Sequence, residues 1–425
     1  MNPIPHFKER ALTIEKRKKE FLNIAEKTGT PLYLYDKAEV QNNYRAFTSA
    51  FKKAGTDIQV FYAVKSNFYP GLLKTLVEEG GNLDVSSDRE LRLALKAGAK
   101  KIIYTGPAKT EKDFELILDN YKKITVNLES ERELELLAKM AAKRKIVARC
   151  GVRIVTAMQA GWTKFGIPIE KLADFFRKAQ KYPSLNFCGI HFHISFNHSP
   201  EKYVRTLSEL AHYLFSNFTK EERDKFEYLD IGGGYYPEHF MARYSWNPDQ
   251  TTNLPPETLD RVFEDKFESR IVPICTDPIE VFAAQISSTL KTKIRPLIPN
   301  AEFYAEPGRF ISHSSMHFLL RLMDIKEGRI GITDGGTNLV GWELFQFYYY
   351  APIFNLSQFS VTREIPFVTY GSLCTPEDLW GYYLYTAGKP KEGDVLLIPY
   401  QGAYTYALCQ TFIKEIAPVY DLDQN

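Results

Sequence analysis

Residues 58–67 read Ile-Gln-Val-Phe-Tyr-Ala-Val-Lys-Ser-Asn, a β-branched and aromatic run that stops at a lysine. Such a run predicts a buried strand. Seven similar runs follow, and amphipathic helical patterns, such as residues 130–143 and 200–218, separate most of them. The eight predicted strands are Ile58–Val64, Asn82–Val85, Ile102–Thr105, Ile124–Asn127, Ile146–Ile154, Leu185–His191, Tyr228–Ile231 and Glu302–Ala305.

Alternation of strands and helices is typical of a parallel sheet, and eight strands close a (β/α)8 TIM barrel of the α/β class. A doubly wound open sheet is the alternative. After Arg309 the apolar runs come without long helices, which predicts a second, all-β domain, a sandwich or barrel. Its predicted segments are Phe318–Ile325, Ile330–Thr333, Phe347–Phe354, Ser360–Val361, Val395–Pro399 and Ala407–Phe412.

The predicted domain boundaries follow from these patterns. Residues 36–310 form the barrel, and residues 1–35 plus 311–425 form the β domain. The strand-like stretch Pro31–Tyr35 is assigned to the β domain. The stretch Trp246–Pro278 contains Asn-Pro and Pro-Pro pairs, so we interpret it as an excursion between the seventh and eighth strands.

Composition excludes several classes of protein. The chain has 425 residues, with 54 basic against 52 acidic side chains, so the basic excess expected of a nucleic-acid binder is missing. No apolar run approaches the roughly 20 residues of a membrane span. The five cysteines are widely spaced without a C-x-x-C pair, which argues against a disulfide scaffold or zinc ribbon. We expect a cytoplasmic protein.

The ends of the predicted strands carry the chemistry, because barrel active sites lie on the loops that follow the strands. Lys65 is either a solvated loop residue or a desolvated amine able to form a Schiff base. Gly232, Gly233 and Gly234 form either a flexible turn or a phosphate cradle. His191 and His193 alternate along the strand and therefore share one face. They could be core histidines, a pair of zinc ligands, or rings that stack on a flat cofactor.

The eighth strand ends at Glu306-Pro307-Gly308-Arg309. Glu306 and Arg309 could simply form an ion pair with each other. Alternatively, Glu306 could pair with a protonated pyridine nitrogen, and the planar guanidinium of Arg309 could bind a phosphate. A Schiff-base lysine, a phosphate cradle, a stacking histidine and this carboxylate together indicate pyridoxal 5'-phosphate. No metal ion is expected.

In these motifs the chain resembles the barrel-type (fold type III) pyridoxal-phosphate decarboxylases, the family of ornithine, arginine and diaminopimelate decarboxylases. The resemblance runs from about residue 30 to residue 412. The matching stretches are Tyr62–Asn67, Asp84-Val85-Ser86-x-x-x-Glu90, Lys164-Phe165-Gly166, His191-x-His193, Gly232–Gly234, Glu306–Arg309, Gly371-Ser372-Leu373-Cys374-x-x-x-Asp378 and Gly402-Ala403-Tyr404.

The resemblance implies a role for each of these residues. Lys65 would carry the cofactor, His193 would stack on its ring and Glu306 would pair with the ring nitrogen. The phosphate would be held by Gly232 to Gly234, Arg309 and Tyr404, and Asp84, Arg153 and Gly308 complete the expected cofactor site. Relatives are head-to-tail homodimers with shared sites, so Cys374 and Asp378 would come from the partner chain. Cys374 would help to protonate the substrate carbon.

Departures from the family pattern concern the substrate. Thr375 stands where relatives that act on free diamino acids carry an acid, although Glu377 lies two residues on. Trp342 stands where an arginine would read a distal carboxylate, and Ile194-Ser195-Phe196-Asn197 replaces the usual Gly-Ser. The Cys-Thr-Pro-x-Asp pattern is similar to the branch acting on acylated amino acids in siderophore and antibiotic assembly.

We therefore expect an α-decarboxylase of an amino acid or an amino-acid conjugate in specialised metabolism, with Cys374, Thr375, Glu377 and Asp378 at the substrate. The alternative is decarboxylation of free diaminopimelate, ornithine, lysine or arginine. A racemase on the same barrel is a rival that Glu306 opposes, because such racemases keep an arginine at that place. A catalytically inactive regulatory homologue is a rival that the intact Lys65 and Cys374 oppose.

Overall fold

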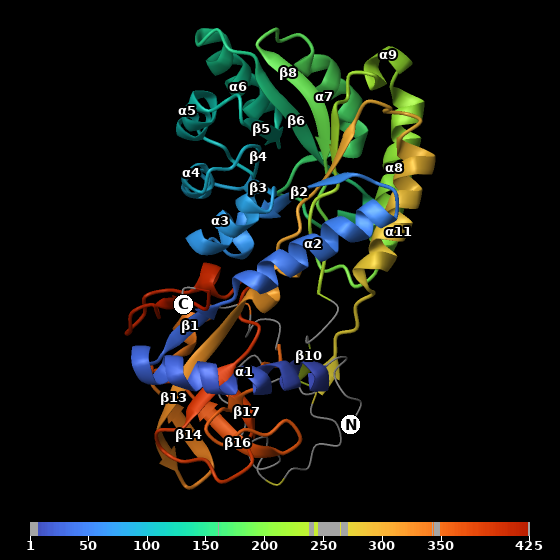
Figure 1. Ribbon diagram of the computed structural model, residues 1–425. Helices are drawn as coiled ribbons and strands as arrows, with labels where there is room; N and C mark the ends of the chain where they lie inside the picture. The colour runs from blue at the N-terminus through green and yellow to red at the C-terminus, as the bar shows by residue number, and fades with distance from the viewer. Residues whose placement is uncertain are drawn as a thin grey trace. The chain divides into compact units, whose positions relative to one another are not determined.

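The computed structural model describes residues 7–159, 161–237, 242–244, 264, 271–341, 343 and 349–423. These residues divide into two compact units. The barrel unit comprises residues 41–236 and 276–311, and the β unit comprises residues 1–40, 237–275 and 312–425. Both are drawn in Figure 1.

The barrel unit is built on parallel strands in the order β5-β4-β3-β2-β12-β9-β8-β6, and a further β5–β6 pairing closes the ring. The (β/α)8 prediction is confirmed, and the open sheet is wrong. A short ninth strand, β7 (Ile167–Pro168), pairs with β6. The eight barrel strands are β2 (Ile58–Ala63), β3 (Asn82–Val85), β4 (Ile102–Thr105), β5 (Ile124–Leu128), β6 (Ala148–Val155), β8 (Leu185–His191), β9 (Tyr228–Asp230) and β12 (Glu302–Ala305).

Helices cover the outside of these strands, as Figure 1 shows for α3 to α6 and for α8 and α11. Several begin at side-chain caps: Ser87, Thr110 and Ser130 each accept a hydrogen bond from a backbone N–H of the first turn. The helices are α2 (Lys37–Lys53), α3 (Pro70–Glu78), α4 (Asp88–Lys96), α5 (Glu111–Asp119), α6 (Glu131–Lys143), α7 (Leu172–Ala179), α8 (Glu201–Asn217), α9 (Lys220–Arg223), α11 (Ile279–Thr289) and α12 (Arg309–Ser312).

Tyr228 shows how side chains fill the barrel interior. It is fully buried in a cluster with Phe61 and Tyr304, and its hydroxyl donates to Asn127 Oδ1 at 2.7 Å. A Cβ at Gly189 would lie 2.0 Å from the Tyr228 ring, and one at Gly151 would lie 2.3 Å from its hydroxyl. The ring therefore occupies space that two glycines leave open.

The β unit holds an eight-stranded sheet in the order β14-β16-β17-β15-β18-β13-β1-β19. A β13–β14 pairing closes part of it into a second barrel, and α1 (Phe7–Thr28) belongs to the same unit. The strands are β1 (Leu32–Tyr35), β13 (Met316–Lys326), β14 (Ile330–Thr333), β15 (Phe354–Asn355), β16 (Glu364–Tyr370), β17 (Leu379–Tyr385), β18 (Val395–Ile398) and β19 (Val419–Asp421).

The stretch between β9 and α11 departs from the predicted domain division. Residues 237–275 group with the β unit and not with the barrel. There β10 (Ala242–Tyr244) pairs antiparallel with β11 (Ile271–Pro273), and the Tyr244 ring packs edge-on against Tyr350 and Tyr382. Most of the predicted excursion Trp246–Pro278 lies outside the described residues.

Strand β1 confirms the assignment of Pro31–Tyr35 to the β domain, because it pairs antiparallel with β13 and parallel with β19. The predicted strands Ser360–Val361 and Ala407–Phe412 are wrong: the first is a loop, and the second begins in a 3-10 helix (Tyr406–Leu408) and continues as a loop with one isolated bridge at Phe412. Within the described residues, no helix is long and apolar enough to cross a membrane.

Candidate active site

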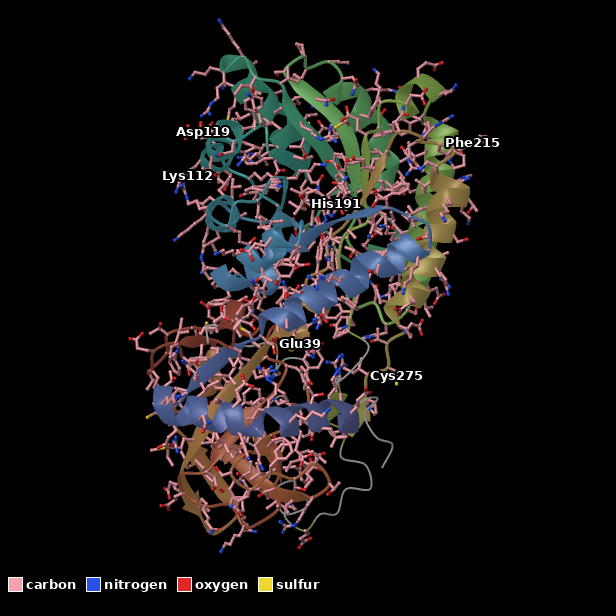
Figure 2. The ribbon with its side chains drawn as sticks, viewed as in Figure 1. Glu39, Lys112, Asp119, His191, Phe215 and Cys275 are labelled. Atoms are coloured by element: carbon pink, nitrogen blue, oxygen red, sulfur yellow. The ribbon has the colours of Figure 1, made fainter. Side chains whose placement is uncertain are left out.

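Glu306 lies between two histidines at the end of the barrel strands. Its Oε1 is 3.4 Å from His191 Nε2, and its Oε2 is 3.3 Å from His193 Nδ1. Glu306 is 1 % exposed, and His191, labelled in Figure 2, is fully buried among the strands. Burial alone would raise the pKa of Glu306, but the facing histidines outweigh it and hold that pKa well below its usual range.

Both histidines are driven toward the neutral form. Burial is the main cause, and it lowers the pKa of His193 to about 4 and lowers that of His191 as well. His193 Nδ1 also lies 3.1 Å from the backbone nitrogen of Gly233, which can only donate. The Ser195 hydroxyl lies 3.3 Å from His193 Nε2, so the serine that departs from the family pattern still faces this ring.

Lys65 follows β2 in a short 3-10 turn, η1 (Val64–Ser66), with its Nζ 3.6 Å from Asp84 Oδ2. The lysine side chain is 38 % exposed, whereas Asp84 is 1 % exposed. Burial raises the pKa of Asp84 well above its usual value, and the charge of Glu306 raises it further. A Cβ at Gly308 would lie 2.9 Å from the Ser66 Cβ, so glycine lets this loop pack against the turn that carries Lys65.

The three glycines after β9 allow close packing of neighbouring strand ends. A Cβ would lie 2.3 Å from the Phe192 carbonyl oxygen at Gly232 and 1.9 Å from the Ile194 carbonyl oxygen at Gly234. Gly232 and Gly234 also have φ values of 69° and 98°, which favour glycine. Because glycine has no side chain, the loop backbone stays uncovered, as a phosphate cradle requires.

Two of the predicted cofactor-site residues are arginines of the barrel unit. Arg153 lies two residues before the end of β6, and its guanidinium donates to Glu129 Oε1 at 3.3 Å and lies over Phe165 at 4.3 Å from the ring centre. Arg309 is 8 % exposed, and its guanidinium lies 5.1 Å from the centre of the Tyr236 ring. Each guanidinium thus lies over an aromatic ring, and the cofactor roles predicted for both arginines stay predictions.

The same end of the barrel has the ligand types of a metal site. One atom each from His191, His193 and Glu306 lies within 4.8 Å of the others. Lys65 and Asp84 lie beside these three residues. A metal site made of His191, His193 and Glu306 would give neither of them a role.

The remaining predicted residues belong to the β unit, and their relation to the barrel residues stays a prediction. Cys374 is exposed. Thr375 donates a hydrogen bond through its hydroxyl to Glu377 Oε2. Tyr404 is half-buried with a φ of 57°, in the left-handed region. Trp342 lies outside the described residues.

Asp378 is buried, and both carboxylate oxygens are engaged within the β unit. Its Oδ1 accepts from the Thr337 backbone N–H at 2.6 Å and from the Thr337 hydroxyl at 2.9 Å, and Oδ2 accepts from the Leu373 N–H at 2.6 Å. These bonds shape the loop that presents Cys374. We therefore interpret Asp378 as a positioning residue rather than as a direct substrate contact.

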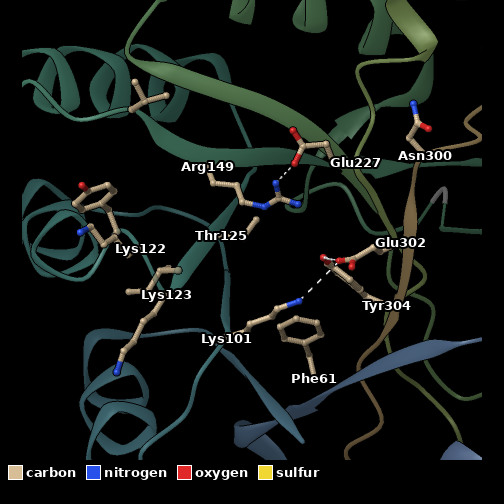
Figure 3. A pocket seen from close by; sticks show the side chains of 13 residues that line it. Phe61, Lys101, Lys122, Lys123, Thr125, Arg149, Glu227, Asn300, Glu302 and Tyr304 are labelled. Carbon is tan, nitrogen blue, oxygen red and sulfur yellow. Dashed lines mark hydrogen bonds and ion pairs between the residues drawn. The ribbon is translucent and has the colours of Figure 1, made fainter.

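A hollow of about 620 Å³ lies at the opposite, amino-terminal end of the barrel strands (Figure 3). Several of its charged groups already have partners: Arg149 pairs with Glu227, and Lys101 donates to Gln59 Oε1 at 3.0 Å and lies 3.9 Å from Glu302. Conserved chemistry in barrels sits at the other end of the strands. This hollow is therefore not our candidate site.

Comparison with known families decides the assignment. A family model described as "Pyridoxal-dependent decarboxylase, pyridoxal binding domain" matches residues 37–313. The chain belongs to this family. It is a pyridoxal-phosphate-dependent amino-acid decarboxylase, with pyridoxal phosphate as its cofactor.

Relatives in this family match most of the chain. A diaminopimelate decarboxylase of Aquifex aeolicus is 27 % identical over 423 residues, covering 96 % of this chain and 89 % of the relative. One from Methanothermobacter thermautotrophicus is 26 % identical, covering 93 % and 87 %.

Solved structures show the same fold. A diaminopimelate decarboxylase from M. jannaschii in complex with L-lysine has a TM-score of 0.76 at 23 % identity, covering 94 % of this chain and 89 % of that one. A lysine/ornithine decarboxylase from Vibrio vulnificus complexed with putrescine has a TM-score of 0.74 at 23 % identity, covering 96 % and 98 %.

The barrel residues fit this cofactor. Glu306 Oε1 is a buried carboxylate oxygen without a hydrogen-bond partner among the described residues, and a protonated ring nitrogen would supply the missing donor. Lys65 keeps an accessible amine, and the glycine loop leaves backbone free of side chains. In this decarboxylase the site residues at the barrel strand ends are therefore consistent with one cofactor.

Sequence reasoning missed two residues of this site. Asp230 ends β9 fully buried, and Glu129 joins Arg153 to the backbone N–H of Gly166, which donates to Glu129 Oε2 at 2.9 Å. The sequence does contain a signal for Asp230, because this acid interrupts the apolar run Tyr228–Ile231 that precedes the three glycines. Glu129 gives no such signal, because it reads as a helix-start residue beside Ser130.

Proposed function

We propose that this decarboxylase acts on a free diamino acid, with diaminopimelate as the first substrate to test. The observation that carries the proposal is the match of diaminopimelate decarboxylases over 93–96 % of this chain and 87–89 % of their own. The hydrogen bond from Thr375 to Glu377 adds to it, since it holds a carboxylate beside the position where an acid reads the distal amine.

The barrel residues would bind and orient the cofactor. Lys65 would hold it covalently, and the ionised Glu306 would keep a proton on its ring nitrogen. His193 would stack on the ring, while the Gly232–Gly234 backbone and Arg309 would bind the phosphate. Pyridoxal phosphate itself supplies the electron sink that accepts the electron pair left when the α-carboxylate departs.

The β unit would supply the remaining groups in a homodimer with shared sites. The Cys374 thiol would return a proton to the substrate carbon, and Asp378 would hold the loop that presents it. Glu377 would pair with the distal ammonium. Tyr404 would complete the phosphate site.

A second candidate is a substrate whose distal end is acylated, as in siderophore assembly. Thr375 favours it, because a threonine stands where an acid is expected. A neutral conjugate would need no carboxylate at this place, whereas a charged amine without a partner would cost several kcal/mol if buried.

The substrate test compares kcat/KM for diaminopimelate, lysine and ornithine with kcat/KM for their distally acylated forms. We expect a free diamino acid to be preferred, and Glu377→Gln to lower its kcat/KM about 10- to 100-fold, as loss of a charged partner predicts. Glu392→Gln, an exposed glutamate of the same unit, is the matched control and should change nothing. Preference for an acylated substrate, with no effect of Glu377→Gln, would favour the second candidate.

The cofactor attachment has its own test. Reduction of the purified holoenzyme with borohydride should fix the pyridoxyl group on the peptide that contains Lys65, as mass spectrometry would show. Lys65→Ala should lose the label and nearly all decarboxylation. A label on another lysine would overturn the assignment of Lys65, and absence of bound cofactor would favour the inactive homologue.

A further inference from the structure

Asp230 is a buried acid at the centre of the barrel end. It closes β9, and its Cα is paired with His191 on β8 and with Tyr304 on β12. Oδ1 accepts the backbone N–H of Gly232 at 2.9 Å. Oδ2 is fully buried and has no hydrogen-bond partner among the described residues.

The neighbour of Asp230 is a second acid. This acid is Glu306, and the carboxyl group of Asp230 lies within hydrogen-bonding reach of the carboxyl group of Glu306. Two ionised carboxylates have only acceptors, so this contact becomes a hydrogen bond only when one of the two carries a proton. The same proton provides a partner for the buried oxygen of Asp230.

The surrounding charges determine which of the two acids, Asp230 or Glu306, carries that proton. Asp84, Asp230 and Glu306 are three carboxyls, each at most 1 % exposed, and the Lys65 ammonium lies 3.6 Å from Asp84. Three buried negative charges against one lysine would leave excess charge at high cost. The other charged or titratable groups that face the cluster are His191, His193, Arg153, Glu90, Tyr203, Tyr228 and Tyr235.

Glu306 is the acid that stays ionised, because, against the effect of burial, the facing histidines and Lys65 hold its pKa well below the usual range, with His191 Nε2 3.4 Å from Oε1 and His193 Nδ1 3.3 Å from Oε2. Burial and the charge of Glu306 both raise the pKa of Asp230 well above its usual value. Asp84 has the Lys65 ammonium at 3.6 Å, whereas the polar contacts of Asp230 are a backbone N–H and another acid.

We propose that Asp230 works as a neutral carboxylic acid: Oδ1 accepts the Gly232 N–H, and the protonated Oδ2 donates to Glu306. Asp230 is thus a positioning residue that ties the glycine loop to the carboxylate of the ring nitrogen. A carboxylate has about four acceptor sites, so Glu306 keeps capacity for that nitrogen. The proposal rests on the cofactor site of the proposed function.

The test reads the proton directly in the cofactor-free protein. Infrared spectra of protein labelled with ¹³C at the aspartate side-chain carboxyl should show the carbonyl stretch of a protonated aspartic acid at pH 7. Asp230→Asn should remove this band or most of its intensity, and Asp84→Asn is the matched control for the second buried aspartate. No such band in the wild type, or a band that Asp230→Asn leaves unchanged, would overturn the proposal.

A second measurement uses the holoenzyme. Asparagine keeps a neutral donor and an acceptor in the same places, so Asp230→Asn should keep the Kd for pyridoxal phosphate and kcat/KM within about threefold. Asp230→Ala should weaken cofactor binding at least tenfold and shift the pH midpoint of the bound cofactor's absorbance. Equal losses in both variants would mean that Asp230 acts as a charge. The infrared result is independent of whether any diamino acid is decarboxylated, so the two proposals fail separately.

Discussion

At the scale of single residues, burial sets the protonation state of His317 on β13. The side chain is 6 % exposed, and its Nδ1 accepts the backbone N–H of Tyr400 at 3.3 Å. Burial lowers the pKa of His317 to about 4; Asp36 opposes this change, while Arg17 and Arg10 add to it. The bond from Tyr400 requires an unprotonated Nδ1, so geometry and electrostatics both favour the neutral ring.

This histidine predicts a pH dependence of stability. An unfolded histidine has a pKa of about 6.5, so between pH 6.5 and 4 the unfolded state binds more protons than the folded state. The stabilisation is complete above pH 6.5 and is lost as the pH falls, by about 3 kcal/mol at pH 4. His317→Asn keeps an acceptor near Nδ1 and does not titrate. Urea unfolding at pH 7.5 and 4.5 should therefore show a smaller acid loss in the variant; parallel losses would contradict the prediction.

The sequence predicts active-site residues where the motif is local. Lys65, His193 and Glu306 each follow a strand directly, so their places at one barrel end follow from topology alone. Asp230 cannot be found in this way, because its role depends on its contact with Glu306, which directly follows β12. Such a cross-strand relation is visible only once the register of β8, β9 and β12 is known.

At the scale of elements, a buried ion pair fastens the loop after β4 to α6. Lys109 is 2 % exposed, and its Nζ donates to the Gly106 carbonyl at 2.6 Å, the Asn127 carbonyl at 2.8 Å and Glu133 Oε2 at 3.0 Å. Glu133 Oε2 also accepts the Glu129 backbone N–H at 2.9 Å. The pair thus supports the residue that holds Arg153.

Breaking this pair on one side should be costly. Lys109→Met leaves the buried Glu133 without its cation, and we expect a loss of about 3–5 kcal/mol in the free energy of unfolding. Lys109→Met with Glu133→Gln should recover part of that loss. Arg205→Ala, which removes the exposed pair with Glu201, is the control and should cost at most about 1 kcal/mol. A Lys109→Met cost as small as the control in urea unfolding would refute this role.

Elements of the barrel are easier to predict than those of the β unit for a physical reason. Parallel strands covered on both faces are continuous apolar runs, and four of the eight predictions match their strands end to end. In β16, Pro366 interrupts the strand pattern, and the pairing with β17 shifts register beside it. Proline weakens a strand prediction, so β16 was missed.

At the scale of the whole molecule, the predicted sites combine residues that lie in different units. Lys65 belongs to the barrel unit and Cys374 to the β unit. If two chains share their sites, mixing inactive Lys65→Ala with inactive Cys374→Ala should restore activity. Random exchange makes half of the dimers mixed, each with one intact site, so about a quarter of wild-type activity is expected.

The measurement is decarboxylation after subunit exchange, with exchange itself verified by differently tagged chains. Each variant alone, carried through the same procedure, is the control and should stay inactive. Restored activity supports shared sites, and no activity despite demonstrated mixed dimers contradicts them.

The domain division was harder to predict than either fold. Residues 237–275 follow a barrel strand directly, so chain order assigns them to the barrel. The β10–β11 pair and its tyrosine contacts place them with the β unit instead. Because the partners of Tyr244, Tyr350 and Tyr382, come more than 100 residues later in the chain, no local pattern near Tyr244 reveals them.

The pairing of β1 has a consequence for synthesis on the ribosome. Its two neighbours, β13 and β19, end at residues 326 and 421, so residues 32–35 are synthesised nearly 300 residues before β13 is complete and nearly 400 residues before β19 is complete. The barrel unit can close once β12, which ends at residue 305, has emerged, and β19 is complete only at residue 421. Translation therefore releases a finished barrel attached to an open β unit, and the nascent N-terminal strand is the part exposed longest to chaperones and to strand-pairing mistakes.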